Sequence, residues 1–429
     1  MKTFLREIWA VTALISTLAI TTAASGQPST SPGKRIYIPE DLRQMDLCSD
    51  ISQWCWQRSA ETRDLIFMWQ RGFGHDLQNP PKLEGQPMAF NLSVLMDRVQ
   101  SFYTFFRDTL RFTLPGSKAD QYKMMVMMNY SLDGTAYGGT YDNFIGALWV
   151  APNRIQDHTM NCMAHELGHS FQAQIMADSV GQAWGGSGFF EMASQWMLWQ
   201  VNPWWLRDEN YHLEAFKALT HKAFLALDNI YHSPYVIQWW SDLHGRESIA
   251  ELFREGHLGE DPVVTYKRMY NMTQQQFNVE MLQGYQHLVD FDFRHAQKET
   301  RPYACQWSTP LDTLRGGWLQ PKTTLEEYGF HVISLPVRKS TRIEIKGKGV
   351  LYALVGVTTD GQRVYGNIDS DRLPPFSGTL RHLFLVTMGA PTEHQQLTMP
   401  SQENLRPVNK MPTFPYQFRV HRSRASHPL

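Results

Sequence analysis

The residues of this sequence best suited to chemistry are two histidines separated by three positions. His165 and His169 enclose Glu166 in the pattern H-E-x-x-H. Because residues four apart lie one turn apart on the same face of an α-helix, both imidazoles can reach one metal ion. The glutamate beside the first histidine can take a proton from a metal-bound water. The pattern therefore predicts a zinc site with Glu166 as the general base.

A catalytic zinc site needs a third protein ligand and keeps a fourth position for water. The extended pattern with a third histidine would place it at position 175, which is Ile175, so that type of site is excluded. The other common source is a glutamate on a following helix, and Glu191 lies in the first turn of a helix predicted from residue 189. We therefore expect His165, His169 and Glu191 to bind Zn²⁺. Gln195, one turn further on, can orient a ligand through a hydrogen bond.

The helix that carries the motif also has an apolar face that can anchor it in a core. Apolar residues recur on it at spacings of three and four: Met160, Met163, Leu167, Phe171 and Ile175. Gly168 lies in the middle of this helix, where glycine costs on the order of 1 kcal/mol relative to alanine. The glycine indicates a close approach by another part of the chain.

The chain before this helix predicts a sheet with a helix packed on it. We expect strands at 65–69, 123–128 and 145–150, and a helix at 91–108 with apolar residues at helical spacing. The intervening segment 130–141 is rich in glycine and tyrosine and predicts a loop. Ala147 to Val150 could offer a strand edge to an extended substrate.

The second half of the chain changes character twice. From residue 157 to about 293 the pattern is helical, and it includes a capping box at Thr273 and Gln276. After Pro302 the hydrophobic period becomes two, which predicts strands: 330–335, 342–346, 351–357, 383–388 and 416–420. We expect an α+β protein with a catalytic domain at 27–300, a mixed sheet plus a helical subdomain, and a C-terminal all-β sandwich-like domain at 301–429.

The N-terminal segment and the charge of the chain indicate where the protein is located and which partners are excluded. Lys2 and Arg6 precede an uncharged, mostly apolar run, which predicts a signal peptide at 1–26 and a secreted or periplasmic protein. No later run approaches the roughly 20 apolar residues that a membrane span needs. The formal net charge of -1 offers no basic field for a nucleic-acid backbone. Nucleic acid is therefore excluded as a partner.

Two resemblances follow from these motifs. HELGH followed by the helical glutamate in FFEMASQW resembles the gluzincin class of zinc metallopeptidases. Together with IYIPEDLRQMDL, GTYDNFIGALWV and AHELGHSFQAQ, it resembles a secreted bacterial family of uncharacterised metalloproteases that includes avirulence-type proteins, over about residues 35–420. The resemblance implies a zincin-like catalytic domain. The interval from His169 to Glu191 is slightly longer than in the best-known gluzincins, so the connection between the two helices should differ.

The resemblance also implies a donor to the oxyanion that develops during peptide hydrolysis. In gluzincins a histidine or tyrosine downstream of the glutamate ligand supplies it. His232 and Tyr235, in the segment IYHSPY, are the candidates. Tyr137 and Tyr141 in the glycine-rich segment are the competitors.

The expected function is therefore hydrolysis of peptide bonds in a protein, peptide or glycoprotein substrate by zinc-activated water. One alternative is a zinc hydrolase that acts on a glycan or a glycan-linked amide, with some of the 14 tryptophans binding sugar. Another is a non-catalytic adhesin or effector with a structural metal. Structural zinc sites are usually closed by four protein ligands, which disfavours that alternative.

Overall fold

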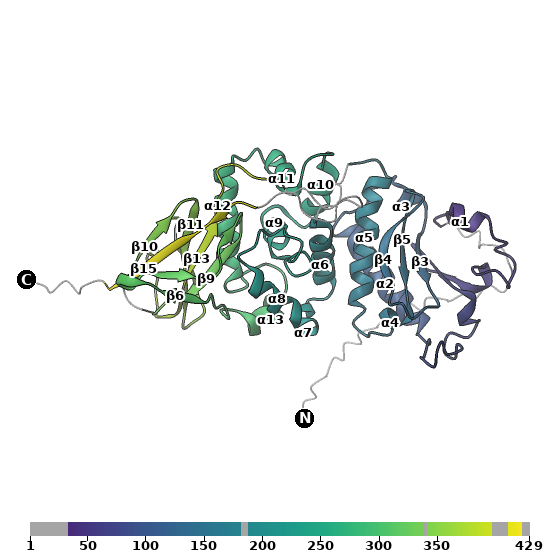
Figure 1. The fold of residues 1–429 in the computed structure, drawn as a ribbon. Helices are drawn as coiled ribbons and strands as arrows, with labels where there is room; N and C mark the ends of the chain where they lie inside the picture. Colours follow the sequence, from purple (N-terminus) through teal and green to yellow (C-terminus); the bar gives the residue numbers. More distant parts are fainter. Residues whose placement is uncertain (1–32, 182–187, 338–340, 397–410, 423–429) are drawn as a thin grey trace, which may run out of the picture.

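The structure is a computed structural model that describes residues 33–181, 188–337, 341–396 and 411–422. The predicted signal peptide at 1–26 lies outside these residues. Figure 1 shows an elongated molecule with one sheet at one end, helices in the middle and further strands at the other end. The chain is an α+β protein, as the sequence predicts.

The first sheet has five strands in the order β1-β2-β3-β5-β4. The central strands β2, β3 and β5 run parallel, and β1 and β4 are antiparallel to their neighbours at the two edges. Every residue of β2 and β3 is buried, as their continuous apolar sequences predict. The bounds are Ser59–Glu61 for β1, Leu65–Trp69 for β2, Met124–Met128 for β3, Ala136–Tyr141 for β4 and Ile145–Val150 for β5.

Strand β4 corrects two predictions from the sequence. The segment 130–141 was expected to be a loop throughout, but residues 136–141 form this edge strand. Its two glycines lower strand propensity, and the sequence could not show that a neighbour demands them. A Cβ at Gly138 would lie 1.8 Å from the carbonyl oxygen of Glu166. Strand β5 has partners on both sides, so the prediction of a free edge at Ala147 to Val150 is wrong, and β4 is the outer strand.

Two long helices pack with this sheet, α2 (Leu92–Asp108) and α5 (Asn161–Ala177). The ring of Phe171 on α5 lies 4.9 Å from that of Tyr103 and 5.7 Å from that of Phe106 on α2. The apolar face that the sequence predicts for the motif helix is therefore buried against α2. Three single-turn helices complete this region: α1 (Glu40–Arg43), α3 (Lys118–Gln121) and α4 (Pro152–Ile155).

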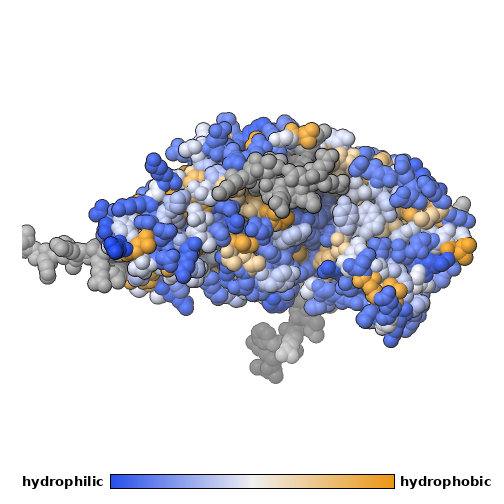
Figure 2. Space-filling model, viewed as in Figure 1, coloured by the Kyte–Doolittle hydropathy of each residue, from blue (hydrophilic) through white to orange (hydrophobic). Residues whose placement is uncertain are grey.

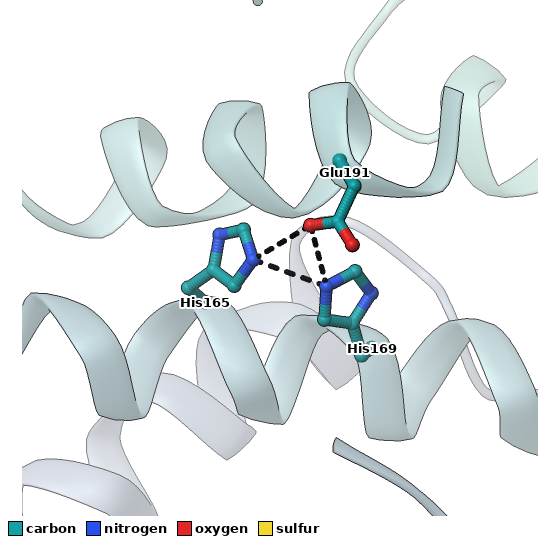
Figure 3. A group of neighbouring side chains, drawn as sticks. All are labelled: His165, His169 and Glu191. Atoms are coloured by element: carbon teal, nitrogen blue, oxygen red, sulfur yellow. Dashed lines mark hydrogen bonds and ion pairs between the residues drawn. The ribbon is translucent and has the colours of Figure 1, made fainter. Parts of the chain in front are cut away.

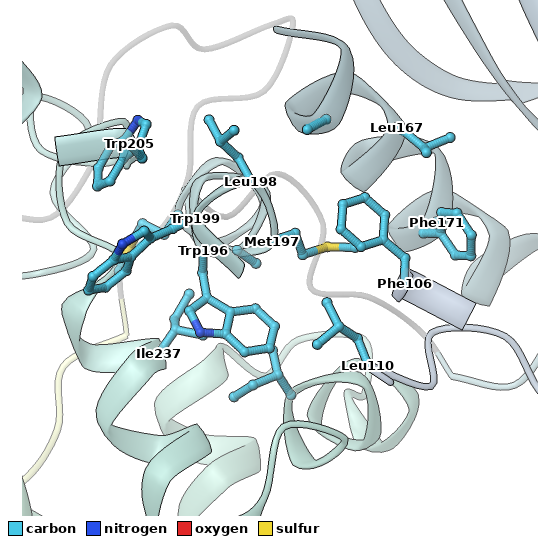
Figure 4. Packing of buried hydrophobic residues seen from close by; sticks show 14 of the residues in the cluster. Phe106, Leu110, Leu167, Phe171, Trp196, Met197, Leu198, Trp199, Trp205 and Ile237 are labelled. Atoms are coloured by element: carbon cyan, nitrogen blue, oxygen red, sulfur yellow. The ribbon is translucent and has the colours of Figure 1, made fainter. Parts of the chain in front are cut away.

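The middle of the molecule is helical, and tryptophans fill much of its core. Trp196, Trp199 and Trp205 are fully buried beside Ile237 and Met197 (Figure 4). The predicted capping box at the start of α12 is present. The helices are α6 (Phe189–Val201), α7 (Trp205–Asp208), α8 (Asn210–Leu219), α9 (Tyr235–His244), α10 (Ser248–Glu255), α11 (Pro262–Met269), α12 (Gln274–Leu288) and α13 (Gln297–Thr300).

The remaining strands form two four-stranded sheets, in the orders β10-β15-β7-β6 and β12-β11-β13-β9, and a short pair, β14-β8. Ile343 and Phe418 of the β10-β15-β7-β6 sheet share one buried cluster with Leu354 and Leu385 of the β12-β11-β13-β9 sheet. The strands are β6 (Leu311–Thr313), β7 (Leu319–Pro321), β8 (Leu325–Glu326), β9 (Phe330–Ser334), β10 (Thr341–Gly347), β11 (Val350–Thr358), β12 (Arg363–Tyr365), β13 (Leu380–Gly389), β14 (Thr413–Phe414) and β15 (Tyr416–Arg422).

A second, larger apolar core runs from the first sheet through the helices to the β12-β11-β13-β9 sheet. Tyr285 of α12 stacks on Phe330 of β9 with ring centres 3.9 Å apart, and its hydroxyl donates to the carbonyl of Tyr328. Buried residues on both sides of residue 300 therefore belong to one cluster. The division into domains at that residue stays a prediction.

Figure 2 shows the hydropathy of the residues on one face of the molecule. Hydrophilic residues cover most of that face, and apolar residues occur in small separate groups. None of the helices in the described ranges has both the length and the apolar character needed to cross a bilayer.

Candidate metal centre

Helix α5, which carries the H-E-x-x-H motif, is fixed on the sheet by side-chain hydrogen bonds. Ser170 Oγ donates to the carbonyl of Ala147 at 2.7 Å, and Gln174 Oε1 accepts from the backbone N–H of Gly146 at 2.7 Å. Both side chains are buried, so leaving them unpaired would be costly. These bonds fix the rotation of α5 about its axis, and therefore the direction in which its two histidines project.

Helix α6 crosses α5 closely at Gly168. A Cβ at this position would lie 2.7 Å from Ser194 Oγ, which is closer than the two atoms can approach. The same hydroxyl donates to the carbonyl of His165 at 3.0 Å. The close approach that the sequence predicts at Gly168 is therefore that of α6, the helix that carries Glu191.

The two helices bring three potential ligand atoms together (Figure 3). His165 Nε2 lies 3.0 Å from His169 Nε2, and Glu191 Oε2 lies 3.1 Å from each of them. The side chains of His165, His169 and Glu191 are 12%, 15% and 25% exposed. Within the described ranges, this is the one group of three or more histidine, cysteine or acidic side chains close enough to share an ion.

The three residues suit a catalytic zinc ion. Zinc binds imidazole nitrogen and carboxylate oxygen at about 2.0–2.2 Å, and tetrahedral geometry then separates neighbouring ligand atoms by about 3.3 Å. The separations of 3.0 and 3.1 Å are close to that value. Two histidines and one glutamate are also one of the ligand sets of catalytic zinc sites, which keep a fourth position for water.

A glutamine orients each histidine. Gln195 Oε1 lies 2.9 Å from His165 Nδ1, and Gln172 Oε1 lies 3.1 Å from His169 Nδ1. The amide nitrogens of these glutamines donate to backbone carbonyls at 2.9 and 3.0 Å. Because a carbonyl only accepts, each amide oxygen must face its histidine, which then carries its proton on Nδ1. Both Nε2 lone pairs are therefore available to a metal. The sequence indicates Gln195 but gives no signal for Gln172.

The two histidines favour the charged form of the Glu191 carboxylate. Burial opposes ionisation of Glu191, but its contacts with His165 and His169 outweigh burial and hold the pKa of Glu191 well below its usual range. Burial also lowers the pKa of His169, and the nearby Glu191 and Glu166 more than reverse this effect. Glu166, the residue after His165, is not part of this group of three.

A tyrosine that has no distinguishing signal in the sequence also borders the group. The ring of Tyr231 lies 6.2 Å from that of His165, at an angle of 28°. Burial and the charges of Glu191 and Glu166 raise the pKa of Tyr231 to about 12, so its hydroxyl keeps its proton at neutral pH. The side chain is 45% exposed and can meet a ligand from solution. No feature of the segment IYHSPY separates this tyrosine from Tyr235 before the fold is known.

The structure places the candidate oxyanion donors His232 and Tyr235 differently from expectation. His232 Nδ1 lies 2.6 Å from His212 Nδ1, and His212 contacts Gln195, so a series of side chains connects His232 to the group. Tyr235 is 2% exposed, and its ring packs 4.6 Å from Phe216 and 5.8 Å from Trp199. It therefore lies in the core of the helical region.

The competing tyrosines of β4 project away from helix α5. Gly138 faces α5, because its Cβ would meet the backbone of Glu166. Successive residues of a strand point to opposite faces, so Tyr137 and Tyr141 project from the other face of the sheet. There Trp149 Nε1 donates to the hydroxyl of Tyr141 at 3.1 Å.

Comparison with known proteins assigns the chain to a family. A family of unknown function, DUF6055, matches residues 28–427, almost the full length. The chain belongs to this family. No curated protein matches the sequence.

Two solved structures are weakly similar to this chain. One, a functionally unknown conserved protein from Bacillus anthracis str. Ames, is 11% identical with a TM-score of 0.33, over 79% of this chain and 75% of that one. The other, the catalytic module of the metalloprotease ZmpA from Clostridium perfringens, is 9% identical with a TM-score of 0.28, over 76% and 64%. This DUF6055 protein therefore spans less than two thirds of the ZmpA module.

Proposed function

We propose that this DUF6055 protein is a zinc-dependent metallopeptidase of the gluzincin type. His165, His169 and Glu191 are the zinc ligands, and Glu166 is the general base. The triangle of three ligand atoms 3.0 to 3.1 Å apart carries this proposal. We also propose a zincin-like domain at 27–300, a sandwich-like domain at 301–429, and export directed by the signal peptide at 1–26.

In the proposed reaction, the metal and the residues around it have separate roles. Zinc, when bound, lowers the pKa of a coordinated water to about 7 and polarises the scissile carbonyl. Glu166 takes the proton of the attacking water and returns it to the leaving nitrogen. Tyr231, whose hydroxyl is protonated at neutral pH, donates to the oxyanion in place of His232 or Tyr235.

The substrate should approach along the outer strand of the first sheet. Strand β4 ends the sheet, and Gly138 brings it into contact with the backbone of Glu166. An extended peptide that adds to this edge would lie beside the catalytic base, held by main-chain hydrogen bonds. This arrangement favours a peptide over a compact substrate.

A structural role for the metal is less well supported. Structural zinc sites are usually closed by four protein ligands. The group here has three among the described residues, and Tyr231 beside it is 45% exposed. An open position with a general base next to it favours catalysis.

The first prediction tests ligands and base together. The purified protein should hold one zinc, and His165→Ala, His169→Ala and Glu191→Ala should each lose it. Glu166→Gln keeps the shape of the side chain but cannot accept a proton, so it should retain zinc while hydrolysis falls about 10²- to 10⁴-fold. Metal analysis and peptide cleavage are measured on the same preparations.

The outcomes separate the competing functions. Full zinc occupancy in Glu191→Ala would remove that residue from the site. Undiminished turnover by zinc-loaded Glu166→Gln would exclude the hydrolytic mechanism. Cleavage of glycopeptides alone, from a mixture of glycosylated and bare peptides, would replace the peptidase by the glycan-directed hydrolase.

A further inference from the structure

A chain of polar side chains leads from the metal centre into the helical region. It begins with Gln195, whose Oε1 lies 2.9 Å from His165 Nδ1. The nitrogen of the same amide lies 3.2 Å from His212 Nε2. His212 Nδ1 in turn lies 2.6 Å from His232 Nδ1. Three histidines are therefore connected in series through one glutamine.

One backbone carbonyl determines which atom donates and which accepts in each hydrogen bond of this series of side chains. The amide nitrogen of Gln195 donates to the carbonyl of Tyr231 at 2.9 Å, which fixes the orientation of the amide. Its second N–H then points at His212 Nε2, which must accept. A neutral His212 that accepts at Nε2 carries its proton on Nδ1 and donates it to His232 Nδ1. His232 is left with its proton on Nε2.

We propose that His212 is a positioning residue for the ligand His165, acting through Gln195. This inference rests on the proposed zinc site and goes beyond it, because His212 contacts neither metal nor substrate. Together with the carbonyl of Tyr231, its accepting Nε2 holds the amide of Gln195 in the orientation that keeps the proton of His165 on Nδ1. A glutamine free to turn over would present N–H to His165 and favour the tautomer whose Nε2 cannot bind zinc.

The surroundings of His212 hold its ring in place. It is 7% exposed on α8 and packs against the rings of Tyr211, 4.3 Å away, and Trp205, 5.4 Å away. Burial and the neighbouring His232 lower the pKa of His212 to about 4, so the ring is neutral at pH 7. Glu209 Oε2 is the competing acceptor for a proton on Nε2, but it lies 3.6 Å away, beyond hydrogen-bonding distance.

Nitrogen NMR of the histidine-labelled, zinc-loaded protein tests the tautomers directly. The ¹⁵N shifts and couplings should show His212 neutral with its proton on Nδ1, and His232 with its proton on Nε2. His212 protonated on Nε2, facing Glu209, would overturn the proposal. This reading is independent of any activity.

Variants test the consequence for the metal. His212→Phe keeps an aromatic ring but removes the acceptor, and zinc affinity measured by chelator competition should fall about 10- to 100-fold, as expected for an outer partner of a ligand. His212→Gln, which can place an amide oxygen near the former Nε2, should restore most of that affinity. The matched control is His295→Phe, another buried histidine, whose Nε2 lies 2.8 Å from the carbonyl of Trp199.

The outcomes separate this proposal from the proposed function. His295→Phe should lose stability but keep wild-type zinc affinity, which excludes a general effect of removing a buried histidine. If the wild-type protein binds no zinc, the proposed function fails. If it binds zinc and folded His212→Phe binds it equally well, the zinc site stands and the positioning role of His212 is refuted.

Discussion

Tyr231 and Tyr235 stand four positions apart, but only Tyr231 borders the metal group. Tyr231→Phe should lower kcat about 10²- to 10³-fold with little change in KM, because an oxyanion donor acts mainly in the transition state. Tyr235→Phe is the matched control. Its hydroxyl is buried without a hydrogen-bond partner among the described residues, so its removal should leave kcat unchanged. Steady-state kinetics on one cleavable peptide compares the two, and a larger loss in Tyr235→Phe would contradict the assignment.

The proposed zinc ligands could be predicted from the sequence, but the proposed oxyanion donor could not. His165 and His169 can be paired from sequence because a helix alone sets their distance. Glu191 follows from the ligand count and the predicted start of the next helix. Tyr231 could not be chosen, because its position depends on how the turn before α9 packs against α5 and α6. Gln172 was missed for the same reason, since its role needs the carbonyl of Phe190 on another helix.

At the scale of the elements, the packing of strand β4 against helix α5 requires a glycine at position 138. A Cβ at Gly138 would meet the backbone of Glu166 at 1.8 Å, whereas one at Gly139 would meet only the side chain of Tyr137, at 3.1 Å. Gly138→Ala should therefore push β4 away from α5, at a cost of about 1–3 kcal/mol or more, and reduce hydrolysis. Gly139→Ala should change both much less. Urea unfolding and kcat/KM of the two variants test this, and equal effects would show that the contact with α5 is unimportant.

Strand β4 also shows that hydrophobic periodicity does not identify every strand. The buried strands β2, β3 and β5 are predictable because uninterrupted apolar runs mark them. In β4, glycine at 138 and 139 removes the apolar alternation that identifies a strand. The glycine at 138 is required by a helix that comes later in the chain. The sequence of β4 therefore reflects its contact with α5 and does not show the alternation typical of a strand.

At the scale of the whole molecule, the helices and the later strands share buried contacts that periodicity alone does not predict. One of these contacts is ionic. His394 follows β13, and its Nε2 lies 2.6 Å from Asp261 Oδ2 at the start of α11. Its Nδ1 contacts Glu327, which follows β8. The side chains of all three residues are almost fully buried.

This buried cluster predicts a loss of stability in alkali. Burial lowers the pKa of His394, but hydrogen bonds to Asp261 and Glu327 outweigh it and raise the pKa to about 9. The unfolded chain has a histidine pKa of about 6.5, so the imidazolium adds stability, on the order of 3 kcal/mol, that is complete below about pH 6.5 and lost as the pH rises through about 9. His394→Gln cannot carry the charge, so its free energy of unfolding should be lower at pH 6 and fall less between pH 7 and 10.

Urea unfolding at a series of pH values measures this slope. Other groups titrate in the same range, so the comparison needs a second variant. His421→Gln removes a histidine that pairs with Glu344 at 2.8 Å, where the two side chains are 37% and 39% exposed. Because solvent screens that pair, this variant should keep the slope of the wild-type protein. If His394→Gln also keeps it, the imidazolium does not link the strands to α11, and the contact with Asp261 contributes only packing.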